Sequence, residues 1–216
     1  MNKFLYNLVY QNRLDKYNLF IEQFRPGKET RILDVGASDM ESLDYANLLE
    51  KKYPYPGNIT VLGIETYGKE FSRRYPRVKT VSYNGGLFPF GDKEFDICWT
   101  SAVIEHVGGV EKQIQFLREV NRVAKSCFIT TPNKYFPVEV HTRLLFLHWL
   151  PKKYFDAALR KIGKSWASGD YMHPMSVRGL KKLLRKSGIN NYRIITNRKF
   201  GLTVDLLVII RALPLP

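Results

Sequence analysis

The feature that most constrains this chain is an alternation of short apolar segments with helical segments. Residues 110–124 illustrate the helical pattern, because their apolar side chains recur every three or four residues. The apolar segments are nearly continuous and occupy residues 31–35, 59–65, 77–83, 95–101 and 126–132. Strands of this kind, separated by helices, are typical of a parallel sheet that helices cover on both faces.

Two more strand-like segments, residues 191–198 and 204–212, follow an amphipathic helix at residues 176–188 and bring the predicted sheet to seven strands. The sequence thus predicts an α/β fold with a Rossmann-like, doubly wound sheet in three layers, α/β/α. We expect the strands to be mostly parallel and the last strand to be antiparallel.

We expect residues 1–216 to form a single domain. An N-terminal helix is predicted at about residues 2–24, because apolar residues keep a helical spacing up to Phe24 and Pro26-Gly27 then ends it. A second helix is predicted at residues 40–52. Between about residues 133 and 175 the rhythm is interrupted by an insert that is rich in aromatic, proline and basic residues.

The net charge of +14 is distributed unevenly along the chain. Residues 1–133 contain 18 lysines and arginines and 16 aspartates and glutamates, whereas residues 134–216 contain 16 and only 4. This asymmetry favours anionic partners such as phosphate groups or an anionic membrane surface, although a solvated basic surface has the same composition. We do not expect a nucleic-acid partner, because the sequence contains no recognised DNA- or RNA-binding motif.

The apolar segments do not indicate a membrane-spanning protein. The longest apolar runs, residues 144–150 and 206–210, are far shorter than the roughly 20 residues that span a bilayer, and the N-terminus lacks the pattern of a signal peptide. Cys98 and Cys127 lie in strand-like segments, where buried free thiols are expected in a reducing compartment. We therefore expect a cytoplasmic protein, with peripheral membrane contact left open. No cysteine–histidine cluster has metal-ligand spacing, so no metal is expected.

Polar and small residues gather where the predicted strands end. They are Asp34-Val35-Gly36, Glu65, Asn84-Gly85-Gly86 and Thr100-Ser101. In a doubly wound sheet, ligands bind outside the carboxyl ends of the strands. Gly36 lets a ligand approach the backbone closely, and the two carboxylate oxygens of Glu65 suit a ribose diol. The pattern favours a nucleotide-type cofactor over ordinary strand ends.

The motifs "ILDVGASD", "VLGIET", "GLFPFGDKEFDICWTSAVIEHVGG" and "FLREVNRVAKSCFITTPN", in this order, give the chain its family resemblance. The chain resembles class I S-adenosylmethionine-dependent methyltransferases, and in particular the group with a type-11 methyltransferase domain. The most specific segment is Leu87–His106, and the resemblance covers residues 30–133. It implies an enzyme whose cofactor is S-adenosylmethionine.

The resemblance also implies which residues hold this cofactor. The loop after the first strand contacts the methionine part, Glu65 binds the ribose, and Thr100 and Ser101 form the floor of the pocket. The implied cofactor-binding residues are Asp34, Gly36, Ala37, Ser38, Glu65, Thr66, Asn84, Gly85, Thr100 and Ser101. Ser38 and Met40 stand where the family usually has glycine. The alternative is therefore a non-catalytic, degenerate methyltransferase fold that serves as a membrane- or partner-binding module.

Methyl transfer to an oxygen atom needs a base, and histidine titrates near neutral pH. His106 and His141 are the predicted catalytic residues, because each follows a strand at its ligand-facing end. His106 could instead cap the turn before Gly108, and Glu139 is expected to point away from His141 if both lie on a helix. We predict methylation of a small-molecule, sugar or lipid-linked acceptor, with oxygen as the expected methylated atom.

Residues 151–166 predict an amphipathic helix within the insert. Its apolar face consists of Tyr154, Phe155, Ala158, Leu159 and Ile162, and basic residues occupy the rest. This helix is either a lid over the substrate pocket or a helix that lies on an anionic membrane surface. Both interpretations fit an anionic small-molecule or lipid-linked substrate. The sequence leaves the oligomeric state open.

Overall fold

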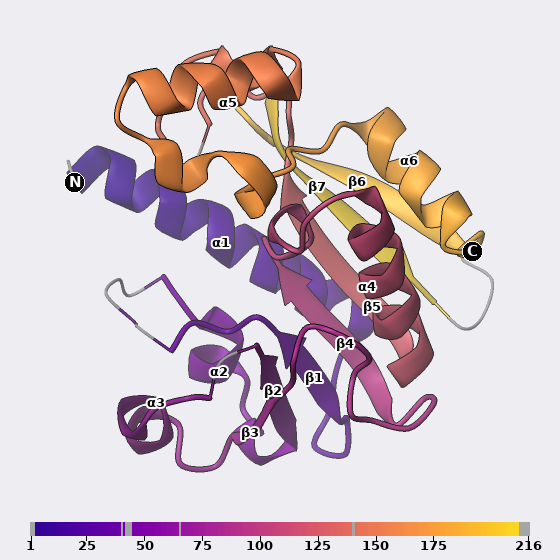
Figure 1. Cartoon of the computed structure of the whole chain (residues 1–216). Coiled ribbons are helices and arrows are strands. Elements are labelled where there is room, and N and C mark those ends of the chain that lie inside the picture. The colour runs from indigo at the N-terminus through magenta and orange to yellow at the C-terminus, as the bar shows by residue number, and fades with distance from the viewer. Residues whose placement is uncertain (1–2, 40, 42–44, 65, 140, 212–216) are drawn as a thin grey trace. The chain divides into compact units, whose positions relative to one another are not determined.

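The structure is a computed structural model that describes residues 3–39, 41, 45–64, 66–139 and 141–211 (Figure 1). Within these residues, seven strands form one sheet in the order β3-β2-β1-β4-β5-β7-β6. The strands are β1 (Ile32–Val35), β2 (Ile59–Gly63), β3 (Lys79–Ser82), β4 (Phe95–Ser101), β5 (Ala124–Pro132), β6 (Tyr192–Lys199) and β7 (Leu202–Ile210).

The directions of the strands follow the predicted pattern. β1 pairs with β2, and β2 with β3, in parallel register. β7 runs antiparallel to both of its neighbours, β5 and β6. The predicted fold class, a Rossmann-like doubly wound sheet of seven strands with an antiparallel last strand, is confirmed.

The described residues contain six α-helices, of which the first precedes the first strand and the others lie between strands. They are α1 (Lys3–Phe24), α2 (Leu48–Lys52), α3 (Lys69–Arg74), α4 (Val110–Val123), α5 (Lys152–Lys161) and α6 (Val177–Lys186). The sequence signals of α6 show why a helix forms there. The Ser176 side chain caps the helix by accepting a hydrogen bond from the Gly179 N–H at 3.1 Å. Leu180 and Leu184 are buried on one face, and Gly188 ends the helix with a φ of 79°.

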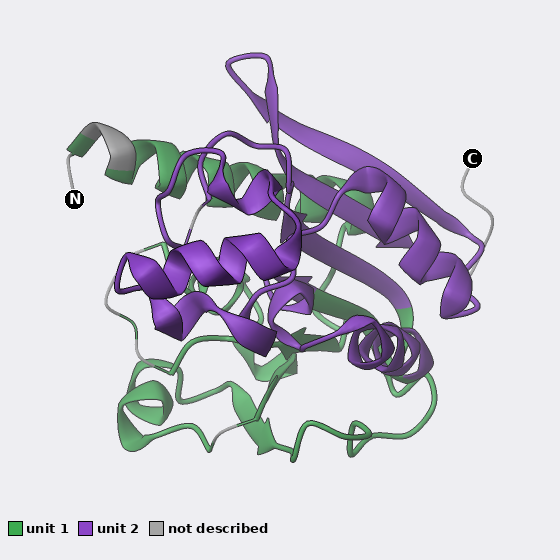
Figure 2. Ribbon diagram, turned by 45° about the horizontal axis from the view of Figure 1, so that its top comes forward, with its two compact units in different colours: residues 1–99, 123–125 green, residues 100–122, 126–216 purple. Residues whose placement is uncertain are grey.

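The chain is divided into two compact units, shown in Figure 2. Unit 1 consists of residues 1–99 and 123–125 and contains α1 to α3, β1 to β3 and most of β4. Unit 2 consists of residues 100–122 and 126–216 and contains α4 (except for its last residue), α5, α6, most of β5, and β6 and β7. The insert therefore belongs entirely to unit 2.

The second predicted helix is shorter than expected. Instead of extending over residues 40–52, α2 begins at Leu48, and residues 40 and 42–44 lie outside the described part of the chain. Asn47 precedes the helix in the left-handed conformation, with φ 50° and ψ 44°. Its side chain forms hydrogen bonds with the backbone of Ser38, so the asparagine fixes the loop after β1 instead of continuing a helix.

The insert has a small hydrophobic core of its own within unit 2. Phe155 and Leu159 of α5 are fully buried against Ala167 and Met172. Part of the predicted apolar face is thus covered by the insert itself, whereas Tyr154 on the same helix is exposed. Among the described residues, no helix has the length and apolar character that crossing a membrane requires.

Candidate active site

The loop after β1 belongs to unit 1 and holds the first predicted cofactor residues. Gly36 leaves the strand with a φ of 92°, a conformation that residues with a Cβ atom rarely adopt. Its N–H donates a hydrogen bond to the Leu62 carbonyl of β2 at 2.9 Å. The chain therefore turns away from the sheet directly after β1, and Gly36 remains exposed at this turn.

The loop after β1 contains one glycine, Gly36, and side chains from two neighbouring segments hold the loop in position. The Ser38 N–H donates to Asn47 Oδ1 at 2.9 Å, and Asn47 Nδ2 donates to the Ser38 carbonyl at 2.8 Å. The Tyr67 hydroxyl donates to the Ala37 carbonyl at 3.0 Å. Gly63 makes room for Tyr67, because a Cβ atom at Gly63 would lie 2.7 Å from the Tyr67 hydroxyl oxygen. The loop is thus held rigidly despite its low glycine content.

Asp34 at the end of β1 and Glu50 of α2 form a buried pair of carboxyl groups. Burial and the negative charge of Glu50 raise the pKa of Asp34 well above its usual value. Burial also raises the pKa of Glu50. The pair therefore holds a proton at a pH at which exposed carboxyl groups are ionised.

The remaining predicted cofactor residues of unit 1 lie after β2 and β3. Thr66 and Asn84 are exposed, and Asn84 Oδ1 accepts a hydrogen bond from the Gly86 N–H at 3.1 Å. Gly85 has a φ of 81° and open space beside its Cα atom. Glu65, the implied ribose ligand, lies outside the described residues.

In unit 2, the end of β4 leads to the first predicted catalytic residue. Thr100 is buried, and the hydroxyl oxygens of Ser101 and Thr130 lie 3.1 Å apart. The chain then turns through Ala102, which has a φ of 59°, into a short 3-10 helix, Ile104–His106. His106 stands at the end of this helix.

The structure brings His106 into contact with His141 of the insert, 35 residues further along the chain. Their Nε2 atoms lie 3.0 Å apart, and the two rings meet edge to face at an interplanar angle of 89°. Each side chain is 24% exposed. The two predicted catalytic residues therefore form one pair that solvent reaches.

Both outer nitrogens of this pair contact acceptors. His106 Nδ1 lies 2.8 Å from the Tyr171 carbonyl oxygen, and His141 Nδ1 lies 2.8 Å from Glu139 Oε1. A carbonyl oxygen can only accept, and the Glu139 carboxylate also accepts from the backbone N–H groups of His141 and Thr142. Both Nδ1 atoms thus carry hydrogen, so in neutral histidines the two Nε2 lone pairs point at each other. A cation between them, such as a shared proton, removes this repulsion.

Glu139 contacts the histidine pair, and the sequence did not predict it as a site residue. The segment is not helical, so the Glu139 side chain folds back onto His141 instead of pointing away. Burial raises the pKa of Glu139, but hydrogen bonds from His141 and Thr142 outweigh this effect and hold the pKa at about 2. The sequence did contain one signal for this contact, namely an acid within two residues of the histidine.

Glu105 completes the cluster around the histidine pair. It is 2% exposed, and its Oε2 atom accepts a hydrogen bond from the Thr131 hydroxyl at 2.9 Å. Its Oε1 atom lies 3.9 Å from His106 Nε2. The ligand atoms of Glu105, His106 and His141 all lie within 4.8 Å of one another. These three residues, which sequence spacing did not group, could hold a metal ion.

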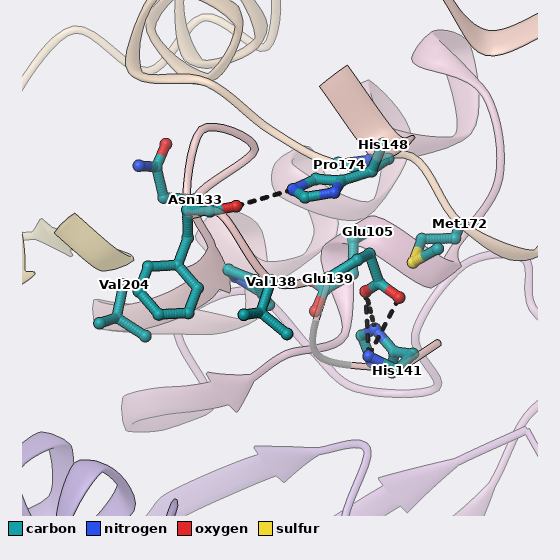
Figure 3. Close-up of a pocket in the computed structure, with 11 residues that line it drawn as sticks. Glu105, Asn133, Val138, Glu139, His141, His148, Met172, Pro174 and Val204 are labelled. Atoms are coloured by element: carbon teal, nitrogen blue, oxygen red, sulfur yellow. Dashed lines mark hydrogen bonds and ion pairs between the residues drawn. The ribbon is translucent and has the colours of Figure 1, made fainter. Parts of the chain in front are cut away.

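A small cavity of about 20 Å³ adjoins this cluster (Figure 3). It is lined by Glu105, Pro132, Asn133, Phe136, Val138, Glu139, His141, His148, Met172, Pro174 and Val204. Its volume suffices for about one water molecule or ion. His148 is buried in its wall, and its Nε2 lies 2.9 Å from the Phe136 carbonyl oxygen. Burial lowers the pKa of His148, which fits a neutral, structural side chain.

A larger pocket of about 450 Å³ in unit 2 shares His148 and Pro174 with this cavity. It is lined by Val110, Gln113, Lys134, Tyr135, His148, Leu150, Lys152, Phe155, His173, Pro174, Met175, Ser176, Gly179, Lys182, Leu183 and Lys186. None of these described residues is acidic. Lys152 is paired with Asp156 at 2.6 Å, whereas Lys134, Lys182 and Lys186 have no acidic partner among the described residues. The pocket can therefore accept an anion.

Comparison with known proteins gives two findings. A family model described as a methyltransferase domain matches residues 33–127. A search among curated proteins finds no significant match.

Solved structures of methyltransferases have a similar fold. A SAM-dependent methyltransferase from Methanosarcina mazei is 17% identical, with a TM-score of 0.53 and coverage of 88% of this chain and 94% of that chain. A SAM-dependent methyltransferase from Aquifex aeolicus is 16% identical, with a TM-score of 0.56 and coverage of 91% of this chain and 89% of that chain. A possible histamine N-methyltransferase from Thermotoga maritima is 15% identical, with a TM-score of 0.56 and coverage of 94% of this chain and 90% of that chain. At these identities the likeness concerns the fold.

Proposed function

We propose that this chain, whose residues 33–127 match a methyltransferase domain, is a class I methyltransferase that uses S-adenosylmethionine as its cofactor and methylates an oxygen atom of an anionic acceptor. The acceptor is a small molecule, a sugar or a lipid-linked compound. The observation that carries this proposal is the lysine-lined pocket of unit 2, which has aromatic and aliphatic walls and no described acidic residue in its lining. Ammonium groups in such a pocket recognise phosphate or carboxylate groups.

The residues of unit 1 fit the cofactor. S-adenosylmethionine supplies an activated methyl group and its own leaving group. The exposed turn at Gly36 gives a ligand access to the backbone, and the rigid loop from Asp34 to Ser38 would hold the methionine part. The open backbone at Gly85, next to Asn84 in the sequence, suits the adenine ring, and Thr66 is proposed to contact the adenine from the loop after β2. The implied role of Glu65 at the ribose remains part of this proposal.

In unit 2, Thr100 and Ser101 are proposed to form the floor of the cofactor pocket. The buried Thr100 hydroxyl has no hydrogen-bond partner among the described residues, so it is available to a ligand. A buried hydroxyl without a partner costs free energy, which a ligand atom at this position would recover.

The His106–His141 pair is proposed to accept the proton of the acceptor hydroxyl. As the acceptor oxygen forms its bond to the methyl carbon, its O–H bond breaks and the proton moves to the position between the two Nε2 atoms. Glu139 and the Tyr171 carbonyl keep both Nδ1 atoms protonated, so both Nε2 lone pairs face this position. Glu139 and Tyr171 thus act as positioning residues.

Exposed apolar side chains of the insert support contact with a membrane surface, which would suit a lipid-linked acceptor. They are Tyr135, Leu145, Phe146, Trp149, Leu150, Tyr154, Ile162, Trp166 and Tyr171. Basic residues such as Lys153 and Arg143 lie among them in sequence, as in surface helices that bind anionic lipids. The same insert could also cover the substrate pocket, because Phe155 and Leu159 are buried on the inner face of α5.

The acceptor class is tested by measuring release of S-adenosylhomocysteine with matched acceptors. A sugar phosphate, its unphosphorylated parent sugar and a lipid-linked sugar phosphate are compared at equal concentration. We expect turnover with the phosphorylated acceptors and little with the parent sugar, and mass spectrometry should locate the new methyl group on oxygen. Equal turnover with the parent sugar, or methylation of nitrogen or carbon, would contradict the proposal.

Membrane contact is tested by flotation of the protein with vesicles that contain anionic lipids. Phe146 is 49% exposed in the insert and Phe200 is 81% exposed in the β6–β7 turn, and both have φ angles near 55°, at 57° and 51°. Asparagine tolerates this conformation, so Phe146→Asn and Phe200→Asn form a matched pair. We expect only Phe146→Asn to reduce vesicle binding. Equal binding by both variants and the unmodified protein would exclude the insert as the contact.

A further inference from the structure

We propose that Glu105, His106 and His141 form a binding site for a divalent first-row transition-metal ion. The inference goes beyond the proposed function and does not rest on it, since metal binding can be measured without cofactor or acceptor. The carrying observation is that the Nε2 atoms of two imidazole rings lie 3.0 Å apart beside the buried Glu105 carboxylate, with the three ligand atoms within 4.8 Å of one another.

The distances suit a metal with nitrogen ligands. Zinc binds histidine nitrogen at about 2.0–2.1 Å, so two histidine nitrogens on one tetrahedral zinc ion are separated by roughly 3.3 Å. The observed separation of 3.0 Å between the Nε2 atoms is close to this value. The carboxylate oxygen of Glu105 lies within 4.8 Å of both nitrogens, so small side-chain rotations bring all three atoms onto one ion.

Each of the three ligands is held from the side that faces away from the proposed ion. The Tyr171 carbonyl accepts from His106 Nδ1, and Glu139 accepts from His141 Nδ1, both at 2.8 Å. The Thr131 hydroxyl donates to Glu105 Oε2 at 2.9 Å, and Glu105 Oε1 lies 3.9 Å from His106 Nε2. Carboxylate or carbonyl partners on the second nitrogen of a histidine are the usual support of metal-binding histidines.

The chemistry of the ligands selects the class of ion. Two imidazoles and one carboxylate are a ligand set of catalytic zinc sites and of related transition-metal sites, whereas magnesium and calcium prefer oxygen ligands. The side chains of His106 and His141 are 24% exposed, so an ion and a further ligand can enter. The adjoining cavity of about 20 Å³ has room for about one water molecule. The cavity lining contains a second carboxylate, Glu139, and none of its described residues is a lysine or arginine.

The test uses the full chain, stripped of metal with a chelator and titrated with Zn²⁺ and Co²⁺. We expect one ion per chain, and the absorption spectrum of bound Co²⁺ should indicate coordination by four or five ligands. His106→Gln and His141→Gln should abolish this binding. Glu139→Gln, which keeps an acceptor but removes its charge, should weaken it by about 10- to 100-fold.

His173→Gln is the matched control, because His173 pairs with Asp170 and is not a ligand of the proposed site. Circular dichroism checks that each variant is folded. Binding that stays unchanged in His106→Gln and His141→Gln, or less than one ion per chain at micromolar Zn²⁺, would overturn the inference.

Methyl transfer measured with and without Zn²⁺ separates the metal site from the proposed catalytic role of the histidine pair. An ion between the Nε2 atoms occupies the position of the proposed proton, so Zn²⁺ should inhibit methyl transfer if the pair is the base. Tight binding at this site without inhibition would support the metal site and contradict the proton-accepting role. Absence of any methyl transfer would contradict the proposed function alone.

Discussion

The two compact units bury glutamates in opposite environments. Glu50 in unit 1 faces another carboxyl group, Asp34, and burial raises the pKa of both. Glu139 in unit 2 is also buried, but it is surrounded by hydrogen-bond donors of His141 and Thr142, and its pKa is held at about 2. The comparison teaches that burial alone does not set the charge of a carboxyl group in this molecule. The number of donors around it decides the direction.

The units also differ in net charge. Unit 1 contains 15 lysines and arginines and 13 aspartates and glutamates, whereas unit 2 contains 19 and 7. The proposed cofactor residues are mostly in the nearly neutral unit, and the proposed acceptor pocket is in the basic one. If this division is functional, changes in each unit should affect one ligand and leave the other unchanged.

The largest expected effect concerns the histidine pair of unit 2. His141→Gln removes one of the two facing Nε2 lone pairs, and the loss of a general base typically costs about 10²- to 10⁴-fold in rate. Single-turnover kinetics at saturating cofactor should show this loss, while calorimetry should show unchanged affinity for S-adenosylmethionine. A His141→Gln variant that keeps the methyl-transfer rate of the unmodified protein would contradict the proposed catalytic role of this residue in unit 2.

The next effect concerns the hydrophobic core of the insert. Phe155→Ala creates a cavity beside Leu159, and such truncations of buried aromatic residues cost about 3–5 kcal/mol. Tyr154→Ala, on the adjacent exposed position, should change stability by less than about 0.5 kcal/mol. Urea denaturation followed by tryptophan fluorescence measures both. Similar values for the two variants would mean that the insert core does not contribute to the stability of unit 2.

A smaller effect is expected for the basic pocket. Lys182→Glu reverses a charge in the pocket lining, and the loss of one charge-assisted hydrogen bond should raise the KM for a phosphorylated acceptor about 10-fold. Lys181→Glu is the matched control, because it makes the same change in net charge on the same helix outside the lining. The KM for the cofactor should not change in either variant. Equal effects of both variants would point to the overall charge instead of the pocket.

The smallest effect concerns the pH dependence of unit 1. Because the pKa of Asp34 is raised, the folded chain binds more protons than the unfolded chain above the ordinary aspartate pKa of about 4. The contribution of the Asp34 carboxyl group to the free energy of unfolding is fully present below that pH. It is lost as the pH rises through the pKa that Asp34 has in the folded chain. Asp34→Asn should therefore be more stable than the unmodified protein at pH 8 and similar to it at pH 4.

Exposed Glu29 provides the control for this measurement, since Glu29→Gln should leave the pH profile of the unfolding free energy unchanged. A profile of Asp34→Asn that parallels the unmodified protein at every pH would show that the buried carboxyl pair does not couple to folding.

The sheet could be predicted from the sequence, because its strands are continuous apolar runs that neighbouring residues alone reveal. The sequence also singled out His106 and His141, because each follows a strand at its ligand-facing end. The sequence placed an acid two residues from His141 but did not give the contact between Glu139 and His141, since this contact depends on the non-helical backbone of the segment. The burial of Glu50 was equally hidden, because it depends on the left-handed turn at Asn47 that shortens α2.

The position of β7 has a consequence for how this protein tolerates shortening. The last strand in the sequence lies between β5 and β6, so it supplies backbone partners to strands on both sides. A chain that stops after Gly201 loses an interior element instead of an edge, and β6 is left without a neighbour to pair with. Tags or truncations that perturb Leu202–Ile210 should therefore damage the pairing of β5, β6 and β7 together.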